Sequence, residues 1–199
     1  MTGTLERLGP DTVHVVVDMQ RLFAEGPGWS VPAFGRILPN VRRLALRRPA
    51  RALYPCFVTP PAAAAARGVW QRYYRHWPEV MAGRLPAGSL EVTAGLSDLV
   101  PPGGRIDKEG FSAYSGPGFA AALERLGAGT ILLTGVETDI CVLSTALESI
   151  DRGYRVVIAT DAVASSAPAA HAAMLAQIYP RYVHLIDLAP TDAILAAWD

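Results

Sequence analysis

Short apolar runs rich in β-branched residues alternate with segments whose apolar residues recur at helical spacing. The runs typical of strands are 13–17, 51–58, 105–108, 130–134, 155–160 and 182–186. The segments typical of helices are 31–48, 119–126, 138–152, 168–179 and 190–198. Strands that alternate with helices form βαβ units, so the pattern predicts an α/β fold over residues 1–199. We expect a single three-layer α/β/α domain with a mostly parallel sheet of about six strands.

Residues 60–102 depart from this alternation. They contain a run of alanines, several glycines and prolines, and an aromatic patch formed by Trp70, Tyr73, Tyr74 and Trp77. The segment predicts one short helix among long surface loops. The aromatic patch fits either a pocket wall or a contact with a neighbouring subunit, and the sequence favours neither.

Composition excludes several classes of protein. The 18 basic and 18 acidic residues balance, whereas nucleic-acid-binding domains usually carry a basic excess. The two cysteines, Cys56 and Cys141, lack the spacing of a zinc ribbon and are too few for a disulfide scaffold. No apolar run approaches the roughly 20 residues that span a bilayer, and the first residues do not resemble a signal peptide. We therefore expect a cytoplasmic protein with neither nucleic acid nor membrane as a partner.

Three chemically useful side chains stand where predicted strands end. Asp18 follows the first strand, Lys108 ends the third, and Cys141 comes shortly after the fourth, near the start of a helix. In parallel sheets the carboxyl ends of the strands meet at one edge, so we expect the three groups to converge. Each alone has an ordinary interpretation: a loop acid, a solvated lysine and a buried structural cysteine, the last of which also fits Cys56. Together they predict a site with a thiol nucleophile.

The helix start near Cys141 favours a thiolate and offers free N–H groups to an oxyanion. Thr138 and Asp139 are expected to cap this helix.

Three stretches resemble the isochorismatase-like cysteine hydrolases, which include nicotinamidases, N-carbamoylsarcosine amidohydrolases and ureidoacrylate hydrolases. They are VVVDMQRLF (15–23), DKEGFSAYSG (107–116) and LLTGVETDICVLSTALESIDRGYRVVIATDAVAS (132–165). The resemblance implies that Cys141 attacks a carbonyl carbon and forms a thioester. Asp18 would carry the proton from the thiol to the departing amine, and Lys108 would stabilise the charges of both.

The same resemblance implies a cis peptide bond between Val136 and Glu137, with the backbone amides of Glu137 and Cys141 forming an oxyanion hole. It also implies a homodimer or homotetramer. Nicotinamidases carry an Asp-x-His metal motif after the second strand, but this chain has Thr59-Pro60-Pro61 there. We therefore expect neither a metal site nor a cofactor.

The leading hypothesis is a metal-independent hydrolase that cleaves the C–N bond of a small amide, ureide or lactam. One alternative is an isochorismatase-type vinyl-ether hydrolase, which Cys141 disfavours because isochorismatases proper lack that nucleophile. Another is a non-catalytic binding relative, against which the complete set of Asp18, Lys108 and Cys141 argues. The residues expected to bind the small-molecule substrate are Phe23, Trp70, Arg72, Phe111 and Tyr114, with Arg72 or Arg67 meeting a substrate carboxylate.

Overall fold

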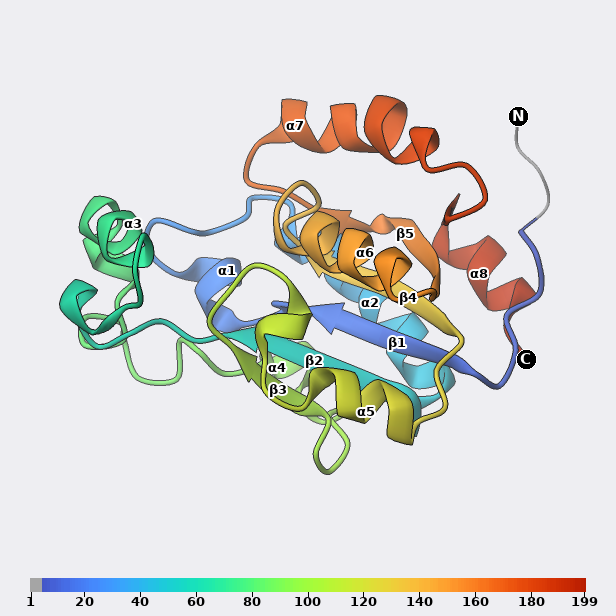
Figure 1. Cartoon of the computed structure of the whole chain (residues 1–199), viewed down its shortest axis with the longest axis horizontal. Helices are drawn as coiled ribbons and strands as arrows, with labels where there is room; N and C mark the ends of the chain where they lie inside the picture. Colours follow the sequence, from blue (N-terminus) through green and yellow to red (C-terminus); the bar gives the residue numbers. More distant parts are fainter. Residues whose placement is uncertain (1–4) are drawn as a thin grey trace.

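A parallel six-stranded sheet runs through the middle of the molecule (Figure 1). The computed structural model describes residues 5–199. Its strands are β1 (Thr12–Val17), β2 (Ala52–Phe57), β3 (Arg105–Lys108), β4 (Thr130–Val136), β5 (Arg155–Ala164) and β6 (Ile186–Ala189). They lie in the order β3-β2-β1-β4-β5-β6, and every neighbouring pair is parallel. The predicted fold is confirmed.

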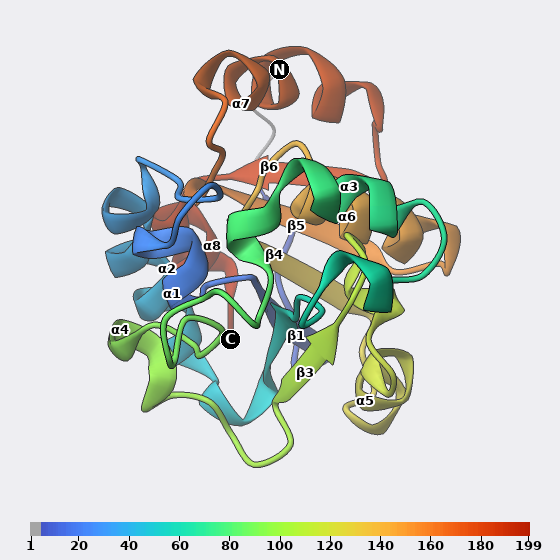
Figure 2. The same cartoon turned by 90° about the vertical axis from the view of Figure 1, so that its left-hand side faces the viewer.

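Helices cover both faces of the sheet because its central strands are apolar on both sides. Both β1 and β4 are buried along their whole length. One face is covered by α2 (Phe34–Arg47) and α8 (Thr191–Ala197), with α1 (Arg21–Glu25) and α4 (Ala94–Ser97) beside α2. The other face is covered by α5 (Phe119–Arg125) and α6 (Cys141–Asp151) (Figure 2). The remaining α-helices are α3 (Trp70–His76) and α7 (Pro168–Ala173).

One predicted element boundary is wrong near the C-terminal end. The last strand is Ile186–Ala189, whereas Tyr182–Ile186 looked strand-like. That stretch turns instead, with His184 at φ 65° and Val183 63% exposed. The helix predicted over 168–179 is α7 followed by a π-helical turn at Met174–Ile178.

The helix predicted to start at residue 138 begins at Cys141. Its N-cap is Ile140, and no side chain makes a capping hydrogen bond there. The Thr138 hydroxyl bonds to His171 Nδ1 at 2.9 Å instead, so the expected capping role of Thr138 and Asp139 is wrong.

The direction in which strands are added reverses between β1 and β4. From β1 the sheet grows through β2 to β3 on one side, and from β4 through β5 to β6 on the other. Ligands in open α/β sheets bind at such a switch point, beyond the carboxyl ends of the strands. In Figure 2 that edge faces the viewer and α3 lies across it.

Among residues 5–199 no helix is long and apolar enough to cross a membrane.

Candidate active site

Asp18 and Lys108 form a buried ion pair at the carboxyl edge of the sheet. Lys108 Nζ lies 2.9 Å from Asp18 Oδ2, and both side chains are fully buried. The backbone N–H of Phe57 donates to Asp18 Oδ1 at 3.0 Å. The lysine also donates to the carbonyls of Gly110 and Phe111 at 3.1 Å each. Removing either partner would leave an uncompensated buried charge, so the two side chains act as a unit.

Burial makes the Asp18 carboxyl more basic than an ordinary aspartate. Burial raises the pKa of Asp18, and the neighbouring Lys108 ammonium opposes that shift. Burial alone would lower the pKa of Lys108, but the neighbouring Asp18 carboxylate, together with Cys141, outweighs it, and the pKa of Lys108 is raised. The lysine therefore stays protonated, while the carboxylate is a stronger base than an ordinary aspartate.

Cys141 is the first residue of α6, and its side chain meets this pair. The residue is 5% exposed, and its thiol is close enough to Asp18 and Lys108 to affect the pKa of both groups. Burial raises the pKa of the thiol well above its ordinary value, although Lys108 opposes the shift. Burial thus opposes the thiolate that the start of the helix was expected to favour. While the thiol is protonated, Asp18 stands where it can take the proton.

The turn between β4 and α6 presents two unused backbone N–H groups. Within residues 5–199 the N–H groups of Glu137 and Cys141 donate to no backbone or side-chain acceptor, whereas those of Thr138 and Val142 do. The peptide bond between Val136 and Glu137 is cis, at the position that the resemblance implied. Two free N–H groups beside a thiol can stabilise an oxyanion by donating hydrogen bonds to it.

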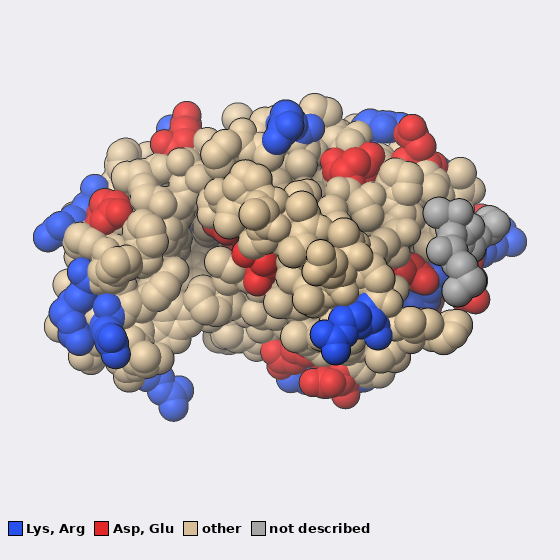
Figure 3. Space-filling model, turned by 90° about the horizontal axis from the view of Figure 1, so that it is seen from above, with Lys and Arg blue, Asp and Glu red and all other residues tan. Residues whose placement is uncertain are grey.

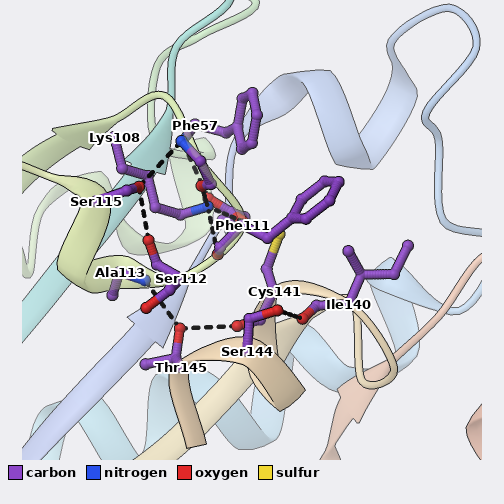
Figure 4. A network of polar contacts seen from close by, with 12 residues as sticks. Phe57, Lys108, Phe111, Ser112, Ala113, Ser115, Ile140, Cys141, Ser144 and Thr145 are labelled. Atoms are coloured by element: carbon purple, nitrogen blue, oxygen red, sulfur yellow. Dashed lines mark hydrogen bonds and ion pairs between the residues drawn. The ribbon is translucent and has the colours of Figure 1, made fainter. Parts of the chain in front are cut away.

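The loop after β3 is fastened to the helix that begins with Cys141 (Figure 4). The Ala113 N–H donates to Thr145 Oγ1 at 3.0 Å, and the Thr145 hydroxyl donates to the Cys141 carbonyl at 2.7 Å. This chain of bonds fixes Lys108 and Phe111 relative to Cys141, although they come from different parts of the sequence.

A small, aromatic pocket of about 40 Å³ opens at the thiol. Its lining residues are Phe23, Trp29, Phe57, Tyr73, Phe111, Glu137, Ile140 and Cys141. The Trp29 ring stacks on Phe23 with centroids 6.0 Å apart and meets the Phe57 ring edge-on at 5.5 Å. Apolar walls exclude water, which strengthens electrostatic interactions with the groups at the floor.

Two of the predicted substrate-binding residues, Phe23 and Phe111, line this pocket. Trp70 lies behind Phe111, with ring centroids 4.9 Å apart, and so supports the wall from outside. Arg72 is exposed on α3 and is not among the lining residues. The aromatic patch on α3 thus packs inward and forms one wall, to which it contributes Tyr73 directly.

Tyr114 does not lie at the pocket, so its predicted role in binding is not supported. Its ring packs edge-on against Phe119 at 4.8 Å, and its hydroxyl donates to Ser149 Oγ at 3.2 Å. The Arg152 guanidinium lies 4.4 Å from its ring centroid. Tyr114 therefore joins α5 to the C-terminal end of α6, away from the thiol at its N-terminal end.

The sequence analysis did not predict that Trp29 and Phe57 line the pocket, nor that Gln20 holds Phe57 in place. The Gln20 side chain donates to the Phe57 carbonyl at 3.0 Å and accepts from the Phe57 N–H at 2.7 Å. Gln20 falls inside the stretch 15–23, which was the available signal. Trp29 lies in a glycine- and proline-containing loop, where no periodic pattern marks it.

The described residues form no cluster of metal-binding side chains at this site. Between residues 5 and 199 no group of three or more His, Cys, Asp or Glu side chains is placed to hold a metal ion. The segment after β2, Thr59-Pro60-Pro61, contributes neither imidazole nor carboxylate.

Comparison with known proteins decides the family. The isochorismatase domain family matches residues 12–190. This chain belongs to the isochorismatase family. Its relative YwoC of Bacillus subtilis strain 168, described as an uncharacterized isochorismatase family protein, is 35% identical over 100 residues. That match covers 47% of this chain and 53% of YwoC, so it spans about half the length of this relative.

Solved structures of other proteins show the same fold. A family protein from Desulfovibrio vulgaris superposes with a TM-score of 0.76 at 23% identity, covering 94% of this chain and 97% of that one. The N-carbamoylsarcosine amidase of Thermoplasma acidophilum superposes with a TM-score of 0.68 at 23% identity, covering 91% and 96%. At these identities the likeness establishes the fold.

Proposed function

We propose that this family member is a cysteine hydrolase that cleaves the C–N bond of a small amide, ureide or lactam through a thioester, without a metal ion. One observation carries the proposal: the Cys141 thiol lies beside the buried Asp18–Lys108 pair at the floor of an aromatic pocket. Membership of the isochorismatase family and the likeness to an amidase support it.

In the first half-reaction Asp18 takes the thiol proton as Cys141 attacks the substrate carbonyl carbon. The carbonyl electron pair moves onto oxygen, and the oxyanion accepts hydrogen bonds from the N–H groups of Glu137 and Cys141. When the tetrahedral intermediate collapses, the C–N bond breaks and the amine leaves with the proton held by Asp18. The acyl group remains on sulfur as a thioester.

In the second half-reaction water attacks the thioester carbonyl and Asp18 takes a proton from it. Collapse of the new tetrahedral intermediate breaks the C–S bond, releases the carboxylic acid and returns the proton to Cys141. Lys108 stays protonated throughout: it keeps Asp18 ionised between steps and opposes the rise in the pKa of the thiol.

A panel of small amides, ureides and lactams, assayed by release of ammonia, amine or ring-opened product, tests the proposal. Wild-type protein should turn over at least one compound, and Cys141→Ala should lose at least ~10³-fold of that rate. Cys56→Ala is the matched control, because this second buried cysteine lies inside β2 and should be dispensable for turnover. A Cys141→Ala protein that hydrolyses the substrate at near wild-type rate would contradict the proposal and favour chemistry that uses Asp18 as an acid.

A further inference from the structure

Glu137 contributes to the pocket at the thiol, and its side-chain carboxylate has no role in the proposed reaction. The residue lines the pocket and is 9% exposed. The hydroxyls of Ser165 and Ser166 donate to its Oε2 at 3.2 and 3.0 Å. Ser165 Oγ accepts from the Ala167 N–H at 3.0 Å, so its own proton is free to point at the carboxylate. These donors hold Glu137 in place as a hydrogen-bond acceptor.

This carboxylate has no cationic partner among residues 5–199. No salt bridge there includes Glu137; burial raises its pKa, and the charged group that raises it further is another acid, Asp139. The cation of the site, Lys108, donates instead to Asp18 and to two carbonyls. A buried anion without a counter-ion is costly, so a ligand that brings a positive charge would gain binding energy.

The charge of Glu137 reaches the pocket. It contributes to raising the pKa of both Tyr73 and Cys141, two residues that line the pocket. A negative charge there opposes ionisation of the nucleophile, which is a disadvantage for the proposed chemistry unless a ligand neutralises it. The aromatic walls formed by Phe23, Trp29 and Tyr73 suit the same kind of ligand, because the faces of aromatic rings attract cations.

We infer that the Glu137 side chain is a specificity-determining residue that selects substrates carrying a compact cationic group, such as an ammonium or guanidinium. This inference rests on the proposed function for the hydrolysed bond and adds the chemistry of the substrate's other end. The bound cation pairs with Glu137 and faces the aromatic walls, while the amide carbonyl lies at Cys141. By neutralising Glu137, the substrate also removes one of the charges that oppose thiolate formation.

The outer surface near α3 carries the opposite charge to Glu137, so an experiment can distinguish which of the two selects the substrate. Figure 3 shows basic side chains gathered at the end of the molecule that holds α3, next to a hollow in this face. Four exposed arginines lie in this region of the chain: Arg67, Arg72, Arg75 and Arg84. None of them lines the pocket. If they selected the substrate, an anionic amide would be preferred, so the two charges give opposite predictions.

Binding to the Cys141→Ala protein separates recognition from turnover. The probes are three amides of similar size with different ends: β-alaninamide (cationic), butanamide (neutral) and succinamate (anionic). Affinities come from quenching of tryptophan fluorescence and from thermal shift at neutral pH. β-Alaninamide should bind at least ~10-fold more tightly than butanamide, and succinamate most weakly.

The charge variant Glu137→Gln keeps the size of the side chain. Added to Cys141→Ala, it should abolish the preference for β-alaninamide, whereas Glu124→Gln, the same change on the exposed face of α5, should retain it. In proteins with Cys141 intact, the ratio of kcat/KM for β-alaninamide over butanamide should fall at least ~10-fold in Glu137→Gln. That ratio should be unchanged in Glu124→Gln.

The outcomes separate this inference from the proposed function. A charge preference that depends on Glu137, seen without hydrolysis of any amide, would support the inference and contradict the proposed reaction. Hydrolysis that depends on Cys141 but is equally fast for cationic, neutral and anionic amides would support the proposed reaction and contradict the inference. Equal affinity for the three probes, binding of none of them, or preference for succinamate would overturn the inference, whether or not the Glu137→Gln protein folds.

Discussion

At the scale of single residues, burial gives Asp18 and Cys141 properties that their sequence positions do not. Both groups are harder to ionise than usual because the aromatic pocket excludes water. The contact between them offsets this cost, since the proton lost by one is taken by the other. The role of Asp18 could be anticipated from the strand it follows, whereas the thiol form of Cys141 depends on packing from distant segments.

The pH dependence of turnover should report the raised pKa of Asp18. The basic form is lost on protonation, and a raised pKa moves that loss to higher pH than for an ordinary aspartate, near 3.9. We expect kcat/KM to fall on the acid side with an apparent pKa above that value. Asp18→Asn should lower kcat/KM at least ~10²-fold and remove this acid limb. A wild-type profile that stays flat down to pH 4 would show that Asp18 is not the base.

Tyr114→Phe should affect stability and leave catalysis unchanged. The variant loses the hydrogen bond from the phenol to Ser149, so the free energy of unfolding should fall by about 1 kcal/mol. Its kcat and KM should match wild type because the ring packs against α5 and α6, away from the thiol. Urea denaturation and steady-state kinetics measure the two effects. A tenfold rise in KM would restore the binding role that the sequence analysis predicted for Tyr114.

At the scale of elements, sequence reasoning succeeded for the buried strands and failed at places where the chain turns. Strands with apolar side chains on both faces, such as β1 and β4, are recognisable because nothing but burial explains them. The stretch Tyr182–Ile186 has the same composition but turns at His184, and the strand begins where it ends. Similarly, α6 starts three residues later than predicted because residues 138–140 form the turn that presents the thiol. Such boundaries depend on tertiary contacts.

Gly135 allows β4 to approach β1 closely, just before the turn that carries Glu137 and Cys141. Its φ is +103°, and a Cβ there would lie 2.0 Å from the Val17 carbonyl oxygen. Gly135→Ala should therefore lower the free energy of unfolding by more than ~3 kcal/mol or prevent folding. Gly153→Ala is the control: its φ is also positive, at +87°, but no atom obstructs a Cβ, so the cost should be about 1–2 kcal/mol. Equal melting behaviour of the two variants would contradict this account of the β1–β4 contact.

At the scale of the whole molecule, the parallel sheet brings Asp18, Lys108 and Cys141 together. This convergence could be predicted because every strand of a parallel sheet ends at the same edge. The pocket walls could not, because Trp29 and α3 belong to irregular segments whose packing depends on the assembled edge. A homodimer or homotetramer, implied by the family resemblance, stays a prediction that light scattering of the purified protein would test.

Turnover should not require a divalent metal ion. The segment after β2 offers a threonine and two prolines where metal-dependent relatives were expected to place ligands, and these side chains bind metal ions poorly. Prolonged treatment with a chelator, followed by desalting, should leave kcat/KM within twofold of the untreated protein. Loss of activity on chelation that zinc or manganese restores would show that a metal site exists and was overlooked.

The thioester on Cys141 is the most direct test of the proposed mechanism. Wild-type protein quenched with acid during turnover of a substrate from the panel should gain the mass of the acyl group, as seen by intact-protein mass spectrometry. Peptide mapping should place that mass on Cys141, and Cys141→Ala should show neither the adduct nor turnover. Turnover by Cys141→Ala at near wild-type rate, with no adduct on the wild-type protein, would contradict the account.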